Sequence, residues 1–336
     1  MKKQWLVFGC LGLIMIALPA YFCADLYFFA HRPAAGTHDG SKVIFKISPG
    51  QSFHQIADHL LLQNLISSTA KFRLLAHIQK ADRKIIAGEY ELSMTMTPIA
   101  VLKTLTDGSV RQLRLFIPEG LTLQQIAERV TAAGFCDSQA FMDATGDESL
   151  VRKMGINAKT FEGFLFPDTY HFTGDVSPEK IIKAMVARFR EAFPPKWENR
   201  AQKMGFSVLE IVTLASMIEK ETGVAEERPV VSSVFHNRLK QKMHLASDPT
   251  VIYGLADFDG NLTRTDLTTL TPYNTYMIAG LPPGPIANPG ASSLHAALFP
   301  ARTDYLYFVA KKDGTHYFST TLEEHTQAVQ EYQLKR

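Results

Sequence analysis

The sequence has few cysteines and no strong excess of charge of either sign. Only three of its 336 residues are cysteine, and two of them, Cys10 and Cys23, lie in an apolar run near the N-terminus. Cys136 therefore has no partner for a disulfide bond in the rest of the chain, which must be stabilised by packing. The formal net charge is +2, from 35 basic and 33 acidic residues. Because this balance offers no attraction to a polyanion, we expect no binding to nucleic acid.

Motifs for metal and nucleotide binding are also lacking. The sequence contains neither the Cys/His spacing of a zinc site nor a glycine-rich phosphate loop. It therefore predicts a function that needs no metal and no cofactor. Hydrophobic residues make up 46% of the chain, which suffices for one large domain or two ordinary ones with proper cores. This content excludes a disordered chain.

A long apolar run, Trp5 to Ala24, follows the basic start MKKQ. About twenty apolar residues are what a bilayer-spanning helix requires. The run does not end in a small-residue cleavage site, and the bulky residues before Cys23 disfavour both cleavage and lipidation there. The two lysines at the start favour a cytoplasmic N-terminus. We therefore expect residues 1–30 to form a cytoplasmic stub and a single-pass transmembrane anchor.

The remainder of the chain is expected to have four segments and an α+β fold. Residues 31–42, rich in Pro, Gly and His, are typical of a linker. Residues 43–110 open with a strand, two amphipathic helices and a strand, which resembles the βααβ order of a peptidoglycan-binding LysM module; a spacer of another kind is the alternative. Residues 111–200 form a connecting α+β region. Residues 201–336 form a mainly helical domain with a C-terminal β-hairpin at an Asp-Gly turn.

One predicted helix of the last segment carries a carboxylate among apolar positions. A capping box marks its start and Gly223 provides a left-handed stop. At about 100° per residue Glu219 falls on the apolar stripe, whereas Glu221 lies off it. Burying an unpaired carboxylate costs several kcal/mol, and a carboxyl group that stays protonated is what a general acid needs. Glu219 is therefore the candidate catalytic acid; the alternative is a structural salt bridge to Arg228 or Arg238.

Blocks of sequence in and after this helix are similar to those of a known family. In order they are ASMIEKETG, ERPVVSSVFHNRL, LASDPTVIYG, TPYNTY and GLPPGPIANPG. Together they resemble the YceG-like family of endolytic murein transglycosylases, and the resemblance covers essentially the whole chain after the anchor. It implies a lyase of the bacterial inner membrane, with its catalytic part in the periplasm, that cuts peptidoglycan glycan strands internally. The implied partners are these strands and possible peptidoglycan synthases.

The resemblance also implies a mechanism with a single, lysozyme-like glutamate. In that family the catalytic residue is the first acid of the EKET block, which is Glu219 here. It would protonate the glycosidic oxygen between N-acetylmuramic acid and N-acetylglucosamine, then remove a proton from the muramic acid 6-hydroxyl. Attack of that hydroxyl on its own anomeric carbon would leave a 1,6-anhydro end.

Polar side chains near the loops after the helix are candidates for holding sugar amides and hydroxyls. Chosen by chemical type and position, they are Asn237, Tyr273, Asn274 and Tyr276. Structural hydrogen bonds within the loops are the alternative. Two other functions stay open. A non-catalytic scaffold would bind peptidoglycan through the first unit, and a lysozyme-type hydrolase would need a second acid facing Glu219. The choices for that acid are Asp168, Glu226 and Asp248.

Overall fold

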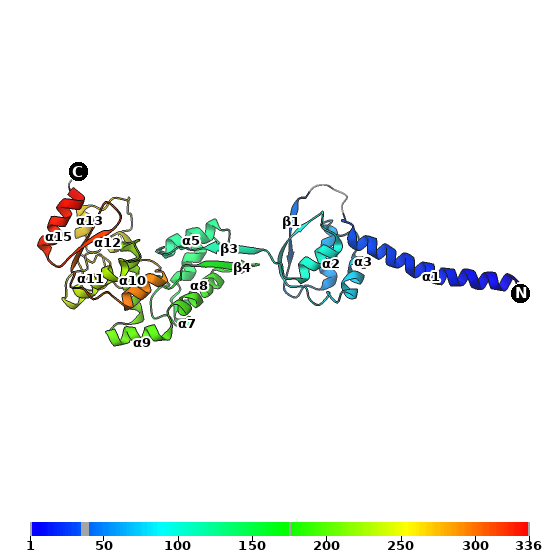
Figure 1. Cartoon of the computed structure of the whole chain (residues 1–336), viewed down its shortest axis with the longest axis horizontal. Coiled ribbons are helices and arrows are strands. Elements are labelled where there is room, and N and C mark those ends of the chain that lie inside the picture. Colours follow the sequence, from blue (N-terminus) through cyan, green and yellow to red (C-terminus); the bar gives the residue numbers. More distant parts are fainter. Residues whose placement is uncertain (1, 35–39, 175, 335–336) are drawn as a thin grey trace. The chain divides into compact units, whose positions relative to one another are not determined.

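The computed structural model describes residues 2–34, 40–174 and 176–334 (Figure 1). Its contacts divide the chain into two compact units. Unit 1 comprises Met1–Leu113 and Phe172–Gly174, and unit 2 comprises Arg114–His171 and Asp175–Arg336. Helices and strands occur in both units, which confirms the predicted α+β class.

Helix α1 (Lys2–His31) leads into unit 1. Its last turns pack on the unit, because Phe29 and Ala30 are buried in the core and Asp25 forms an ion pair with Lys71 at 2.7 Å. For most of the predicted anchor the structure describes the helical backbone only, because the side chains of residues 2–14 and 16 are not described. Among the residues whose side chains are described, no single helix has the length and apolar character to cross a membrane. The helices α9 (Pro195–Met204) and α10 (Val208–Glu221), bent by 92° at the break between them, satisfy that criterion as a pair.

Unit 1 has the predicted order of strand, helix, helix, strand, followed by one more helix. The elements are β1 (Lys42–Ile47), α2 (Phe53–Leu62), α3 (Thr69–Ile78), β2 (Gly88–Ser93) and α4 (Pro98–Thr106). The strands pair antiparallel, with Lys42 opposite Ser93 and Ile47 opposite Gly88. The element order is thus confirmed, while the likeness to a LysM module stays a prediction.

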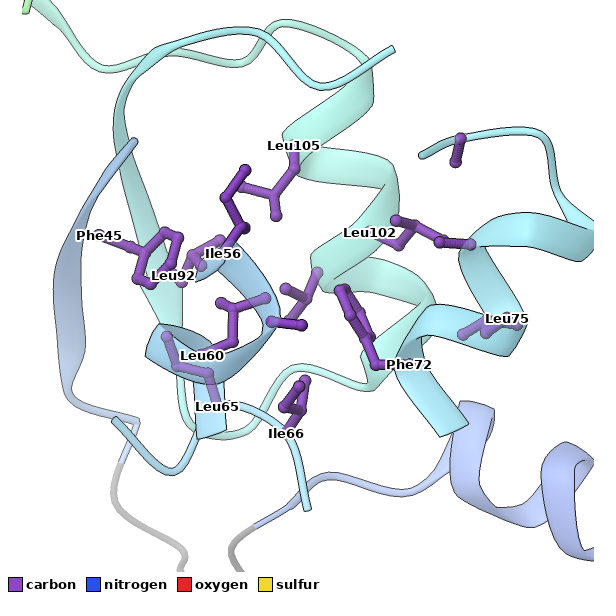
Figure 2. Close-up of a cluster of buried hydrophobic side chains, with 14 of the residues drawn as sticks. Phe45, Ile56, Leu60, Leu65, Ile66, Phe72, Leu75, Leu92, Leu102 and Leu105 are labelled. Atoms are coloured by element: carbon purple, nitrogen blue, oxygen red, sulfur yellow. The ribbon is translucent and has the colours of Figure 1, made fainter. Parts of the chain in front are cut away.

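Local chemistry and a shared apolar core explain these elements. Ser52 begins α2 with a capping box. Its hydroxyl accepts a hydrogen bond from the backbone N–H of Gln55, and the Gln55 side chain accepts one from the backbone N–H of Ser52. Figure 2 shows Phe45 and Leu92 from the strands and Phe72 from α3 converging on one cluster. Unit 1 therefore has a core of its own.

The next part of the chain forms a small sheet and short helices, all of them in unit 2 except the first two residues of β3 and the last two of β4, which fall in unit 1. The elements are β3 (Gln112–Phe116), α5 (Leu123–Ala132), α6 (Ser138–Gly146), α7 (Glu148–Lys153), β4 (Thr169–Thr173), α8 (Pro178–Ala192) and α9 (Pro195–Met204). Strand β3 pairs with β4. The start of α5 is tied to the rest of the unit by Glu162, whose carboxylate accepts from the Leu123 N–H at 3.2 Å.

The second part of unit 2 is mainly helical and ends in the predicted hairpin. Its elements are α10 (Val208–Glu221), α11 (Arg228–Lys240), α12 (Asp248–Gly254), α13 (Arg264–Thr268), α14 (Ala291–Leu298), β5 (Tyr307–Ala310), β6 (His316–Ser319), α15 (Leu322–Val329) and η1 (Gln330–Leu334). Strands β5 and β6 pair antiparallel, with Tyr307 opposite Ser319. Gly314 in the connecting turn has a φ of +82°, which favours glycine. The hairpin is therefore confirmed.

Helix α10 is the central helix of unit 2. Every residue from position 211 to position 218 is buried, and α9, α11, α12 and α14 all contact the helix. The prediction of a single buried stripe is therefore wrong, because neighbours cover α10 on all sides. The predicted left-handed stop at Gly223 is also wrong: the helix ends at Glu221, and Thr222 is extended with a φ of −140°.

Candidate active site

A pocket of about 430 Å³ lies at the C-terminal end of α10. Its walls come from α10, α11, the following loops, the hairpin and α15. The polar and aromatic residues that line it include Glu221, Arg238, Asp248, Tyr276, Tyr307 and His325. Two acids and an arginine thus share one cavity with aromatic walls, which is the character expected of a binding or catalytic site.

Glu221 is the buried carboxyl group of this pocket. Burial raises its pKa to about 7, and the negative charge of Asp248 contributes to the rise. The hydrogen bond donated by the Ser247 hydroxyl and the positive charge of Arg238 oppose the shift. A carboxyl group that keeps its proton close to neutral pH can give it to a leaving group, so Glu221 has the property required of a general acid.

A buried hydroxyl network holds Ser247 against Glu221. The Ser247 N–H donates to the hydroxyl of Thr275 at 3.0 Å, and the Thr250 hydroxyl donates to the Ser247 carbonyl at 2.6 Å. Ala246, just before, has a φ of +48°, which is unfavourable for a residue with a Cβ atom. The surrounding bonds keep this backbone in place, and strain of this kind is common at functional sites.

Two further side chains shape the same pocket. The Tyr276 hydroxyl donates to a carboxylate oxygen of Asp248 at 2.7 Å. Arg238 donates from Nε to the Leu306 carbonyl at 2.6 Å, and its guanidinium lies 5.2 Å from the centre of the Tyr307 ring. The arginine is therefore a fixed positive charge in the pocket. Of the four predicted sugar-binding residues, Tyr276 lines this pocket.

Glu219 occupies a different environment on the same helix. Its side chain is 7% exposed, and one carboxylate oxygen accepts from the Gly290 N–H at 3.0 Å. The other oxygen lies 3.7 Å from a guanidinium nitrogen of Arg228. Glu219 does not line the pocket around Glu221. The ion pair with Arg228 is therefore present, while the role of Glu219, catalytic or structural, stays a prediction.

A second acid near Glu219 was missed by the reasoning from sequence. A Cβ atom at Gly290 would collide with the carboxylate of Glu119, so the Glu119 side chain occupies the space beside this glycine. Burial raises the pKa of Glu119, the negative charge of Glu219 adds to the rise, and Arg228 opposes it. Glu119 lies in the turn before α5, and nothing in its local sequence indicates that it approaches α10.

Two predicted sugar-binding residues are hydrogen-bonded to the backbone of loops, and sugar binding by them stays a prediction. The Asn237 amide donates to the backbone carbonyls of Thr303 at 2.8 Å and Tyr305 at 2.9 Å. Asn274 is fully buried, and its amide donates to three carbonyls in and after α13, the shortest of these bonds being 2.7 Å to Thr269. These bonds match the structural alternative stated for both residues.

The remaining predicted residue, Tyr273, belongs to a separate cluster. Its ring centre lies 4.8 Å from that of Tyr253, whose hydroxyl donates to Glu162 at 3.1 Å. Glu162 also accepts from the Asn288 amide at 2.9 Å, and burial raises its pKa to about 7. None of these residues lines the pocket of Glu221.

The three acids considered as a second carboxylate are placed differently. Asp248 lines the pocket with Glu221. Asp168 is paired with Arg188 at 2.6 Å, and the hydrogen bond from Arg188 lowers its pKa. Glu226 is exposed. Among the described residues, no group of three or more His, Cys, Asp or Glu side chains is arranged to hold a metal ion.

Comparisons with known proteins agree with the resemblance read from the sequence blocks. The model of the YceG-like family matches residues 45–331. The endolytic murein transglycosylase of Bacillus subtilis is 36% identical over 306 residues, which cover 86% of this chain and 84% of that protein. The endolytic murein transglycosylase of Streptococcus pneumoniae serotype 2 is 30% identical over 319 residues, covering 85% of this chain and 57% of that protein.

A solved structure supports the same family relationship. The crystal structure of a YceG-like protein from Listeria monocytogenes matches with a TM-score of 0.61 and 37% identity. The match covers 86% of this chain and all of that chain. Because the family model spans most of the sequence and similar relatives match over most of this chain, the chain belongs to the YceG-like family.

Proposed function

We propose that this protein is an endolytic lytic transglycosylase, which cleaves the bond between N-acetylmuramic acid and N-acetylglucosamine within peptidoglycan glycan strands. Relatives named endolytic murein transglycosylases support the enzyme class and the substrate. The observation that carries the chemistry is the buried, protonatable carboxyl group of Glu221 in a pocket with Asp248 and Tyr276.

One carboxyl group suffices for the proposed reaction. The protonated acid gives its proton to the glycosidic oxygen while that bond breaks through an oxocarbenium-like state. The resulting carboxylate then takes the proton of the muramic acid 6-hydroxyl, whose oxygen bonds to the anomeric carbon. The product is a 1,6-anhydro end, and the acid has recovered its proton. Because the nucleophile belongs to the substrate, its effective concentration is high and no water is consumed.

Two carboxyl groups at the end of α10, those of Glu219 and Glu221, are candidates for this acid. Glu221 lies in a cavity large enough for substrate groups, and its burial favours the protonated form. Glu219 accepts a hydrogen bond from a backbone N–H and lies beside Arg228, much as Glu221 accepts from Ser247 and faces Arg238. The hypothesis from sequence, that Glu219 is the acid, is kept as the competing assignment.

Two matched variants test the function and the assignment together. The full chain, Glu219→Gln and Glu221→Gln would each digest purified peptidoglycan, and the products would be identified by mass spectrometry. We expect anhydro-muramic ends on multi-disaccharide fragments from the full chain and from Glu219→Gln, and none from Glu221→Gln. The opposite pattern would assign the acid to Glu219. If no protein cleaves the strands, the scaffold function would replace the proposed one.

A lysozyme-type hydrolase is the second candidate, because Asp248 lines the pocket of Glu221 and could act as the second carboxylate. The same digest separates the two reactions, since hydrolysis leaves reducing ends in place of anhydro ends. Loss of all activity in Asp248→Asn, together with reducing ends from the unmodified chain, would establish the hydrolase.

The cellular setting is also a proposal. The apolar run Trp5 to Ala24 supports a single-pass anchor in the bacterial inner membrane with the catalytic part in the periplasm. An enzyme held there would meet nascent strands beside the peptidoglycan synthases, and cutting them would terminate their elongation. Protease digestion of spheroplasts tests this topology: the catalytic part should be degraded from outside, and its protection would place it in the cytoplasm.

A further inference from the structure

The segment of residues 286–290 runs along helix α10 and ends at Glu219. The Ile286 N–H donates to the Ser216 hydroxyl at 3.0 Å, and the Gly290 N–H donates to the Glu219 carboxylate at 3.0 Å. Ser216 and Glu219 are three residues apart on α10, so they lie on one face of the helix. The position of the N–H group that Glu219 accepts from therefore depends on what holds this segment in place.

Asn288, midway along the segment, is fully buried and is held by both its side chain and its backbone. Its side-chain carbonyl accepts from the Leu165 N–H at 2.9 Å. Its amide donates to the Leu121 carbonyl at 3.0 Å and to the Glu162 carboxylate at 2.9 Å. Its backbone N–H donates to the Leu121 carbonyl at 2.8 Å, and its backbone carbonyl accepts from the Gly120 N–H at 2.9 Å. One side chain thus connects the segment to two distant parts of the chain.

The same asparagine holds a second glycine beside Glu219. A Cβ atom at Gly120 would lie 3.5 Å from the Cγ of Glu219, so the backbone of Gly120 lies close to this side chain. The Gly120 carbonyl also accepts from Nζ of Lys220 at 3.4 Å. Because the Gly120 N–H donates to Asn288, both glycines next to Glu219, Gly120 and Gly290, depend on the place of Asn288.

Glu162 in turn orients the Asn288 side chain. One oxygen of its carboxyl group accepts from the Leu123 N–H at 3.2 Å and from the Tyr253 hydroxyl at 3.1 Å, so α5 and α12 fix the group. The other oxygen accepts from the Asn288 amide. Since this oxygen accepts while the Leu165 N–H donates, only one of the two orientations of the Asn288 amide satisfies both.

We propose that Glu162 is a positioning residue for Glu219. Acting through Asn288, it fixes the two glycines beside Glu219, and so the direction in which that carboxyl group points. The consequence for cleavage rests on the proposed function. An acid must be aimed at the glycosidic oxygen, so kcat depends on Glu162 if Glu219 gives the proton and does not if Glu221 gives it. The variant Glu162→Gln therefore tests the positioning and, independently of the acids themselves, the assignment of the acid.

The sequence allows a selective probe of the Gly290 N–H. Proline precedes glycine at three places, namely Pro49–Gly50, Pro283–Gly284 and Pro289–Gly290. Isotopic labelling of the proline carbonyl carbon and the glycine nitrogen therefore selects three amide signals in an NMR spectrum of the full chain in detergent micelles. Pro49→Ala and Pro283→Ala each remove one signal and so assign the third to Gly290.

The position of this signal reports the hydrogen bond to Glu219. Glu219→Gln removes the charge of the acceptor and gives the reference shift for a weakened bond. We expect Glu162→Gln to move the Gly290 signal in the same direction and to leave the Gly50 signal, which belongs to unit 1, in place. Val151→Ala, at a fully buried position on α7, is the matched control, because it should lower stability without moving the Gly290 signal.

The kinetics of peptidoglycan cleavage provide the second readout. If Glu219→Gln is inactive, kcat of Glu162→Gln should fall at least about tenfold, with KM within about twofold of the unmodified enzyme. If Glu219→Gln is active, kcat of Glu162→Gln should equal that of Val151→Ala. A kcat that does not follow Glu219→Gln in this way would overturn the proposal, as would an unmoved Gly290 signal or an equal movement in Val151→Ala.

Failure of the proposed function gives a different result. If no protein cleaves the strands, the NMR spectra alone decide the positioning. If Glu162→Gln does not fold, Glu162→Asp takes its place in both experiments, because its shorter side chain keeps the carboxylate but loses reach to the Asn288 amide.

Discussion

Glu162 should make unit 2 less stable as the pH rises from about 5 to 8. Its side chain is 5% exposed and accepts hydrogen bonds from Leu123, Tyr253 and Asn288. Burial nevertheless raises its pKa from 4.5 to about 7, because these bonds offset only part of the cost of removing the charge from water. The carboxyl group is therefore protonated in the folded protein at pH values where it is ionised in the unfolded chain.

The size of the effect follows from the two pKa values. Between pH 4.5 and 7 the folded state binds more protons than the unfolded state, so the free energy of unfolding falls as the pH rises. Each pKa unit corresponds to about 1.4 kcal/mol, so a rise from about pH 5 to 8 removes on the order of 3 kcal/mol. Above the folded pKa both states are ionised, and this contribution stops changing.

The perturbation is Glu162→Gln, compared with Glu128→Gln at an exposed position on α5. Urea unfolding would be followed by Trp197 fluorescence in the Trp5→Phe background at several pH values from about 5 to 8. The amide introduced at position 162 cannot replace every acceptor contact of the carboxyl group, so we expect a loss of about 1–3 kcal/mol at the acid end of this range. The decisive result is the pH dependence, which should shrink by about 3 kcal/mol in Glu162→Gln only. An unchanged pH dependence in that variant would refute the reasoning.

Three further predictions concern other parts of unit 2. Asp248→Asn should lower the pKa of Glu221 by removing a negative charge, so any remaining activity should fall off at lower pH than in the unmodified enzyme, as a pH profile of kcat/KM would show. Gly163→Ala should destabilise the protein by about 2–4 kcal/mol in urea unfolding, because the φ is +85° and the new Cβ would lie 2.5 Å from Pro285; a loss below about 1 kcal/mol would contradict this. Cys136→Ser should change the unfolding free energy by less than about 0.5 kcal/mol, because Cys136 is a free thiol, and a large drop in Tm would show that the thiol packs tightly.

The order of elements was predictable wherever the signals are local. The capping box at Ser207 begins α10, and the Asp-Gly turn connects β5 and β6, because such contacts involve residues only a few positions apart. The ordered sequence blocks identified the family, which the family model then confirmed. The end of α10 was predicted less well. The sequence predicted a left-handed stop at Gly223, whereas the helix ends at Glu221 because Thr222 already has an extended backbone.

The sequence by itself determined the fold class, the element order of unit 1, the hairpin and the family. Only the tertiary structure decided which carboxyl group of α10 faces a cavity. Periodicity placed Glu219 on the apolar stripe and Glu221 off it, but it could not predict the surroundings of either acid, because neighbours bury residues 211–218 of α10 on every side. The loop at Ser247 encloses Glu221, while Gly290 and Arg228 engage Glu219. These partners come from distant parts of the chain, and they meet only when the core around α10 has formed.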